Sequence, residues 1–163
     1  MPEAWGQFVL KVDKRIEDQL RDDYFSTTVI EEIFTNAEIN PELYMGKKDT
    51  VAFENHLLDW DFRNELPQEK RTVIKKGYAG AEIFGSEWLG FTYILAKEGS
   101  NLEFYANLWD EYGYRLKLGK NRSGQLYGIT FDEENSDELE SFGSGSWDKF
   151  VPSQVQKFFN DIT

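Results

Sequence analysis

Apolar residues near the N-terminus recur three and four positions apart, which is the spacing of an amphipathic helix. Pro2 precedes them, at a place that suits the first turn of a helix. The pattern predicts a first helix over residues 3–22. Its apolar positions are Trp5, Phe8, Val9, Val12, Ile16 and Leu20.

A second helix is predicted to begin near Thr28, because Thr28 and Glu31 have the spacing of a capping box and an apolar stripe follows. This helix is expected to end before Asn40. In residues 41–77 the apolar positions fit neither the period of a helix nor that of a strand, so we expect one or two short strands with irregular flanks.

Between Tyr78 and Phe131 the pattern changes to short aromatic and β-branched runs separated by turn residues, which is typical of an antiparallel meander. Residues alternate along its strands, so successive side chains are expected on opposite faces of a sheet. One face carries Leu102, Phe104, Ala106, Leu108, Leu116 and Leu118, and the other carries Glu103, Tyr105, Asn107, Trp109, Arg115 and Lys117. The sheet is therefore predicted to have one apolar face and one mixed face.

Pro152 is expected to open a last helix, whose buried stripe would be Val155, Phe158, Phe159 and Ile162. The order of elements predicts an α+β fold in a single domain over residues 1–163. Its parts are N-terminal helices, a central antiparallel meander of about four to five strands, and a C-terminal helix packed on the apolar sheet face.

The composition predicts a chain that folds and stays in solution. Hydrophobic residues make up 40% of it and aromatic residues 16%, too much for a disordered segment. No apolar run approaches the roughly 20 residues of a membrane span, and the N-terminus lacks the pattern of a secretory signal. Because the chain has no cysteine, it suits a reducing compartment. We expect a cytoplasmic protein that does not engage a membrane.

The net charge of −12 disfavours direct binding to nucleic acid and suits a basic protein partner. The charge is uneven along the chain. Residues 76–131 hold six acidic and six basic residues, whereas residues 132–163 hold eight acidic and two basic residues. The excess acid therefore lies outside the predicted sheet.

The densest acidic run follows the meander, and its carboxylates are Asp132, Glu133, Glu134, Asp137, Glu138 and Glu140. A calcium loop of the EF-hand type is not expected, because Asp137 and Gly143 stand where that loop needs glycine and glutamate. Two interpretations remain: a solvated loop, or an acidic surface that meets a cationic cleft on another macromolecule.

The mixed sheet face is a second candidate surface, made of Tyr105, Trp109, Arg115 and Lys117. Aromatic side chains with polar surroundings are typical of binding surfaces. The alternative is that residues 41–77 cover this face and that its aromatic residues belong to a second layer of core.

Catalytic chemistry finds little support in the sequence. His56 is the only histidine, so the chain by itself cannot build a zinc site with two histidines or a Cys/His pair. The glycines between Gly77 and Gly90 fit no phosphate-binding pattern. Asp59 and Asp61 would share one face of a strand and could do acid–base work. We predict no catalytic residue, no metal ligand and no cofactor.

The resulting hypothesis is a non-enzymatic acidic protein that binds or inhibits a basic macromolecular partner. Proteins of this kind include immunity proteins for nuclease toxins and inhibitors that imitate DNA. The alternative is a carboxylate-dependent enzyme, or a small-ligand-binding domain that uses the aromatic sheet face. A concave site with converging acids, one of them with a raised pKa, would favour the alternative.

Overall fold

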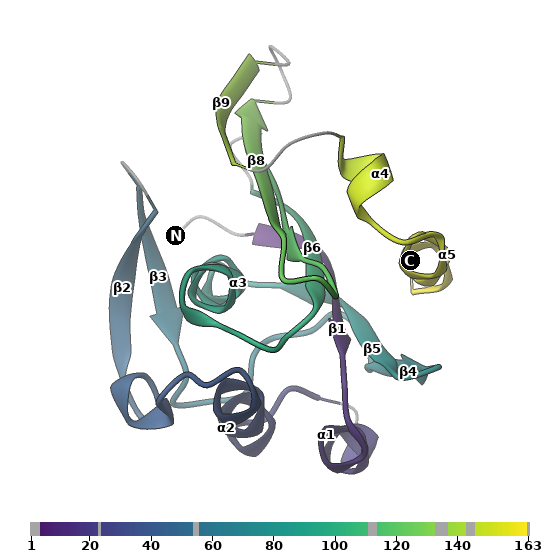
Figure 1. The fold of residues 1–163 in the computed structure, drawn as a ribbon. Helices are drawn as coiled ribbons and strands as arrows, with labels where there is room; N and C mark the ends of the chain where they lie inside the picture. Colours follow the sequence, from purple (N-terminus) through teal and green to yellow (C-terminus); the bar gives the residue numbers. More distant parts are fainter. Residues whose placement is uncertain are drawn as a thin grey trace.

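The computed structural model describes residues 4–162, except residues 23, 54–55, 111–113, 133–136 and 143–145. For residues 22, 53, 56–57, 110, 114–115, 129–132 and 137–142 it describes the backbone only. The described residues form a seven-stranded sheet, a separate two-stranded hairpin, and helices on both sides of the sheet (Figure 1).

The large sheet is antiparallel throughout, with the strand order β4-β5-β1-β6-β7-β8-β9. Its strands are β1 (Ala4–Lys11), β4 (Val73–Lys75), β5 (Tyr78–Phe84), β6 (Phe104–Asp110), β7 (Tyr114–Lys120), β8 (Leu126–Asp132) and β9 (Asp137–Phe142). The strands β6 to β9 follow one another in sequence and in space, so they are a meander. The small hairpin pairs β2 (Lys48–Phe53) with β3 (His56–Asp61).

The helices divide between the two faces of the sheet (Figure 1). On one side lie α1 (Lys14–Gln19), α2 (Thr27–Asn36) and α3 (Glu87–Glu98), together with the β2–β3 hairpin. On the other side lie α4 (Trp147–Phe150) and α5 (Ser153–Asp161). Two short 3-10 turns, η1 (Leu20–Asp22) and η2 (Pro41–Leu43), follow α1 and α2.

The predicted fold class is confirmed: helices and an antiparallel sheet are combined, with helices near both ends of the chain. The predicted second helix is α2, although its N-cap is Ser26, whose hydroxyl accepts a hydrogen bond from the backbone N–H of Val29 at 3.3 Å. The last helix is α5, and its predicted stripe is buried. In residues 41–77 the structure has η2, the β2–β3 hairpin and β4.

The predicted helix over residues 3–22 is wrong. Its first half is β1, and only Lys14–Gln19 forms the helix α1. The strand is covered on both faces, since Phe8 and Leu10 belong to one hydrophobic cluster and Val9 belongs to the other. A strand buried on both sides loses its alternation, and here the apolar run imitates a helical period.

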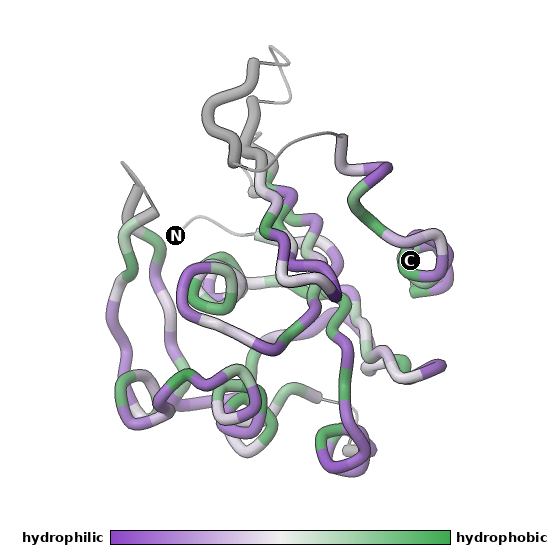
Figure 2. The backbone as a smooth tube through the Cα atoms, in the orientation of Figure 1, coloured by the Kyte–Doolittle hydropathy of each residue, from purple (hydrophilic) through white to green (hydrophobic). Residues whose placement is uncertain are grey.

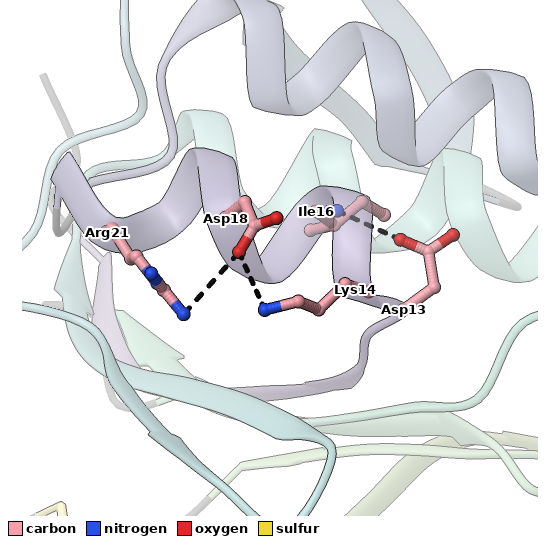
Figure 3. A network of polar contacts seen from close by, with 5 residues as sticks. All are labelled: Asp13, Lys14, Ile16, Asp18 and Arg21. Carbon is pink, nitrogen blue, oxygen red and sulfur yellow. Dashed lines mark hydrogen bonds and ion pairs between the residues drawn. The ribbon is translucent and has the colours of Figure 1, made fainter.

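The short helix α1 is held by local polar contacts (Figure 3). The Asp13 carboxylate caps it by accepting a hydrogen bond from the backbone N–H of Ile16 at 2.9 Å. Asp18 lies between two cations, with its oxygen 3.1 Å from Lys14 Nζ and 3.5 Å from an Arg21 nitrogen. These side chains are largely exposed, so each ion pair contributes at most about 1 kcal/mol.

The prediction of strands throughout residues 78–131 is also corrected, because α3 lies between β5 and β6. This helix packs between β3 and β7, and it approaches β3 so closely that a Cβ at Gly90 would lie 2.6 Å from the Asp59 carbonyl oxygen. A helix covered on two sides has no continuous polar face, which removes the helical signal from its sequence. Its buried residues are Trp88, Gly90, Phe91, Thr92, Ile94, Leu95 and Ala96.

The C-terminal helix packs on the face of the sheet that was predicted to be mixed, and its predicted place on the apolar face is wrong. The larger hydrophobic cluster lies between the opposite face and α1, α2 and α3, and Phe8, Phe104 and Trp88 belong to it. The smaller cluster joins α5 to Val9 and Tyr105. Figure 2 shows hydrophobic residues on α3 and on α5, on opposite sides of the sheet. Both faces of the sheet are apolar where a helix lies on them, so the prediction of a single apolar face is only partly correct.

Candidate binding surface: an acidic edge strand and an aromatic row

The predicted acidic run lies at one edge of the large sheet. Its last part is β9, which pairs only with β8 among the described strands. The backbone of Asp137 pairs with that of Asp132, Glu138 pairs with Phe131, and Glu140 pairs with Thr130. Glu133 and Glu134 lie outside the described residues. The sequence identified the acidic run, and the tertiary structure adds that three of its carboxylates belong to an edge strand.

The β8–β9 hairpin extends beyond the helices that cover the two faces of the sheet (Figure 1). A macromolecule can therefore approach the acidic edge without first meeting α3 or α5. Charged residues on an edge strand also oppose pairing with another sheet. Protection of the edge is therefore one consequence of this placement.

The four residues predicted on the mixed face have different environments. Tyr105 is fully buried, and its ring contacts the Phe150 ring at a centroid distance of 5.8 Å. Trp109 and Lys117 are partly exposed. The backbone of Arg115 pairs with that of Trp109. The segment expected to cover this face, residues 41–77, places its β2–β3 hairpin on the other side of the sheet, and α4 and α5 provide the cover instead (Figure 1).

An aromatic row, made of Phe84, Trp5 and Trp109, crosses three neighbouring strands on the mixed face. Trp5 pairs with Phe84 on one side and with Trp109 on the other. The two indole rings meet edge to face, with centroids 6.1 Å apart. Trp5 is 37% exposed and Phe84 is 41% exposed. Trp5 and Phe84 were not predicted as a site, because the pattern around Trp5 indicates a helix and the sequence does not reveal the pairing of β5 with β1.

A buried polar cluster lies on the same face, next to α5. Glu103 is 5% exposed, and its Oε2 accepts hydrogen bonds from the hydroxyls of Tyr78 and Tyr105, each at 2.8 Å. Burial, strengthened by the bond to Glu103, raises the pKa of both tyrosine hydroxyls above their usual range, and Arg122 opposes this. Both tyrosine hydroxyls are therefore kept neutral and act as hydrogen-bond donors. The cluster stabilises the packing of α5 on β5 and β6.

The predicted acid pair gives no support to acid–base catalysis. Asp61 binds Arg63 through both carboxylate oxygens, at 2.8 and 3.0 Å. This hydrogen bonding lowers the pKa of Asp61, whereas a general acid at neutral pH needs a raised pKa. Asp59 is exposed on the same strand. His56 contributes its backbone to β3, and its side chain lies outside the described part of the chain.

A surface pocket of about 390 Å³ lies at the end of β1, between α1, α2 and residues 101–103. Its apolar lining includes Val12, Ile16 and Ile33. The Asp13 carboxylate at its rim is occupied, since one oxygen caps α1 and the other accepts a hydrogen bond from the Asn36 amide at 2.9 Å. The pocket is distinct from both the acidic edge and the aromatic row.

Two other features are absent from the residues that the structure describes. No three or more His, Asp or Glu side chains among them come together in a way that could hold a metal ion. None of the helices there has the length and apolarity that crossing a membrane requires. Comparisons with models of protein families, with curated proteins and with solved structures found no match to this chain.

Proposed function

We propose that this chain binds a basic macromolecular partner through its acidic edge strand, in the manner of an immunity protein for a nuclease toxin or of an inhibitor that imitates DNA. The observation that carries the proposal is the placement of Asp137, Glu138 and Glu140 on β9, at the open edge of the sheet. The net charge of −12 adds long-range attraction for a cationic surface.

The distribution of charge supports a localised surface. Residues 132–163 carry eight of the acidic residues and only two of the basic ones, while residues 76–131 are neutral on balance. Because residues of a β-strand rise roughly 3.3 Å each, the backbone from residue 137 to residue 140 spans roughly 10 Å, so a partner with several cations can engage more than one of these residues. Such contacts raise the association rate and depend strongly on salt.

The test compares two triple variants of equal net charge. The edge variant, D137N/E138Q/E140Q, neutralises β9, and the control variant, E31Q/E42Q/E65Q, neutralises three exposed acids on other elements. The probe is a purified linker histone, and the readout is its release from a labelled DNA duplex at about 50 mM salt, where surface charge is least screened.

The wild-type protein is expected to displace the labelled DNA from the histone. The edge variant should need an about tenfold higher concentration to do so, if each charge contributes about 0.5 kcal/mol. The control variant should stay within about threefold of the wild type. Equal losses in the two variants would mean that net charge alone drives binding. Failure of the wild type to displace DNA at low salt would reject the proposal.

A further inference from the structure

The pocket at the end of β1 has an aliphatic floor. Its volume is about 390 Å³, and small-molecule sites of proteins commonly enclose about 300–1,000 Å³. Val12, Ile16 and Ile33 line it and are at most 7% exposed, and Leu102 is partly buried beside them. All four side chains pack in the larger hydrophobic cluster, so the core holds the floor in place. The pocket can therefore receive the apolar body of a small organic molecule.

Two of the charged residues that line the pocket direct their charges to the opposite side of the sheet. The Lys11 ammonium lies over the Tyr78 ring, with Nζ 4.7 Å from the ring centroid. The Glu103 carboxylate accepts hydrogen bonds from the hydroxyls of Tyr78 and Tyr105. Both tyrosines lie on the side of the smaller cluster, under α5, whereas the floor of the pocket belongs to the larger cluster. Neither charge therefore faces a molecule in the pocket.

The third charged residue of the lining, Asp13, keeps its charge on the pocket side. Its two oxygens accept hydrogen bonds from the backbone N–H of Ile16 and from the Asn36 amide, each at 2.9 Å. Both donors are neutral, and each carboxylate oxygen has a second lone pair. Within the part of the chain that the structure describes, Asp13 forms no ion pair. Its negative charge is therefore available to a cation in the pocket.

The two cations that follow Asp13 in the chain are held by other acids. Lys14 Nζ lies 3.1 Å from an Asp18 oxygen, and an Arg15 nitrogen lies 2.9 Å from a Glu32 oxygen. Neither Lys14 nor Arg15 lines the pocket. They therefore do not neutralise the rim.

The C-terminal end of α2 makes the surroundings of the pocket more negative. Asn36 is the last residue of α2 and lines the pocket, and no basic residue lies in the last turn of this helix. The C-terminal end of a helix carries the equivalent of about half a negative charge. Beside it, the Glu38 carboxylate accepts a hydrogen bond from the amide of Asn101, another lining residue, at 3.3 Å. An apolar floor below a negative rim favours a cation with an apolar body.

We infer that this pocket binds a small organic cation, whose apolar body packs on Val12, Ile16 and Ile33 while its ammonium group pairs with Asp13. Burial of the apolar body supplies a favourable free energy of binding. The ammonium adds a charge-assisted hydrogen bond, which is stronger than one from a neutral donor. The inference is independent of the proposed binding at β9, because the pocket and the acidic edge share no residue.

The test uses the isotope-labelled full chain and three probes with the same phenyl body. Phenethylamine is a cation at neutral pH, 2-phenylethanol is uncharged, and 3-phenylpropionate is an anion. The readout is the NMR shift of the backbone N–H signals of Val12, Ile16, Ile33 and Leu102. The variant is D13N, since asparagine caps a helix about as well as aspartate does. The matched control is D18N, which removes one charge from the same helix outside the pocket.

Phenethylamine is expected to shift the pocket signals saturably, with a Kd on the order of 1 mM for a ligand of this size. The alcohol should bind about three- to fivefold more weakly, and the anion more weakly still. D13N should weaken the binding of the amine by about three- to fivefold, whereas D18N should stay within about twofold of the wild type. D13N should leave the affinity for the alcohol unchanged, which shows that the pocket keeps its shape.

Three results would overturn the inference, and all of them leave the proposal for β9 standing. If no probe moves the pocket signals at about 10 mM, the pocket is not a ligand site. If the alcohol or the anion binds as tightly as the amine, the pocket does not select a cation. If D13N weakens the amine no more than D18N does, or weakens the amine and the alcohol alike, Asp13 is not the counter-ion.

Discussion

The buried cluster around Glu103 permits a sharp prediction about stability. In the variant E103L, the hydroxyls of Tyr78 and Tyr105 lose the oxygen that accepts both of their hydrogen bonds at 2.8 Å. Both tyrosines are at most 3% exposed, so water cannot replace the acceptor without rearrangement. Each unsatisfied hydroxyl costs about 2 kcal/mol, and we expect a loss of about 4 kcal/mol in the free energy of unfolding.

A triple variant separates the hydrogen bonds from the packing. In E103L/Y78F/Y105F the three buried polar groups are replaced by apolar groups of similar shape, and Arg122, which also interacts with Tyr78, is exposed and can be solvated by water instead. Such a replacement is close to neutral when no buried polar atom is left unpaired. This variant should therefore be more stable than E103L by about 3 kcal/mol, although it carries more substitutions. Urea unfolding followed by circular dichroism measures each value by linear extrapolation.

The expected loss in E103L corresponds to a fall in melting temperature of about 8–16 °C for a domain of this size. A loss below about 1 kcal/mol would show that the hydroxyls do not depend on Glu103. A triple variant as unstable as E103L would show that the cost came from packing. Either outcome would refute the assignment of this cluster as a set of mutually dependent hydrogen bonds.

Two further predictions concern glycines with positive φ and the dependence of stability on alkaline pH. G6A should lower the free energy of urea unfolding by about 3 kcal/mol, because Gly6 has a φ of +152° and a Cβ would lie 2.1 Å from the Asn107 carbonyl oxygen. The control is G124A: Gly124 has a φ of +79° and open space around it, so this variant should lose only about 1 kcal/mol. Burial and the hydrogen bond to Glu98 raise the pKa of the Tyr44 hydroxyl. Unfolded chains therefore release the Tyr44 proton near pH 10, while folded chains keep it. The free energy of unfolding should fall as pH rises above 10. Y44F should remove up to about 1.4 kcal/mol per pH unit from that slope in unfolding measured above about pH 10, and an unchanged slope would contradict the raised pKa.

The sequence by itself determined the elements that are covered on one side. The helix α5 shows a buried stripe and a polar remainder, and Thr28 with the apolar positions after it predicted α2, although the N-cap itself is Ser26. The strand β6 is an exception, because helices cover both of its faces where Phe104 and Tyr105 lie, and its alternation was legible only because Glu103 and Asn107 stand between the apolar positions. The acidic run and the class of fold were accessible for the same reason, since composition and period are local properties of the chain.

Only the tertiary structure decided the elements that are covered on two sides. In β1 the residues Phe8 and Val9 enter different clusters, and in α3 seven of the twelve residues are buried, so neither sequence keeps a continuous polar face from which a period can be read. The aromatic row also depends on pairing: Trp5 and Phe84 are 79 positions apart in the chain and meet only because β1 pairs with β5. The register between distant strands is set by their packing, so it cannot be predicted from the sequence around Trp5 or around Phe84.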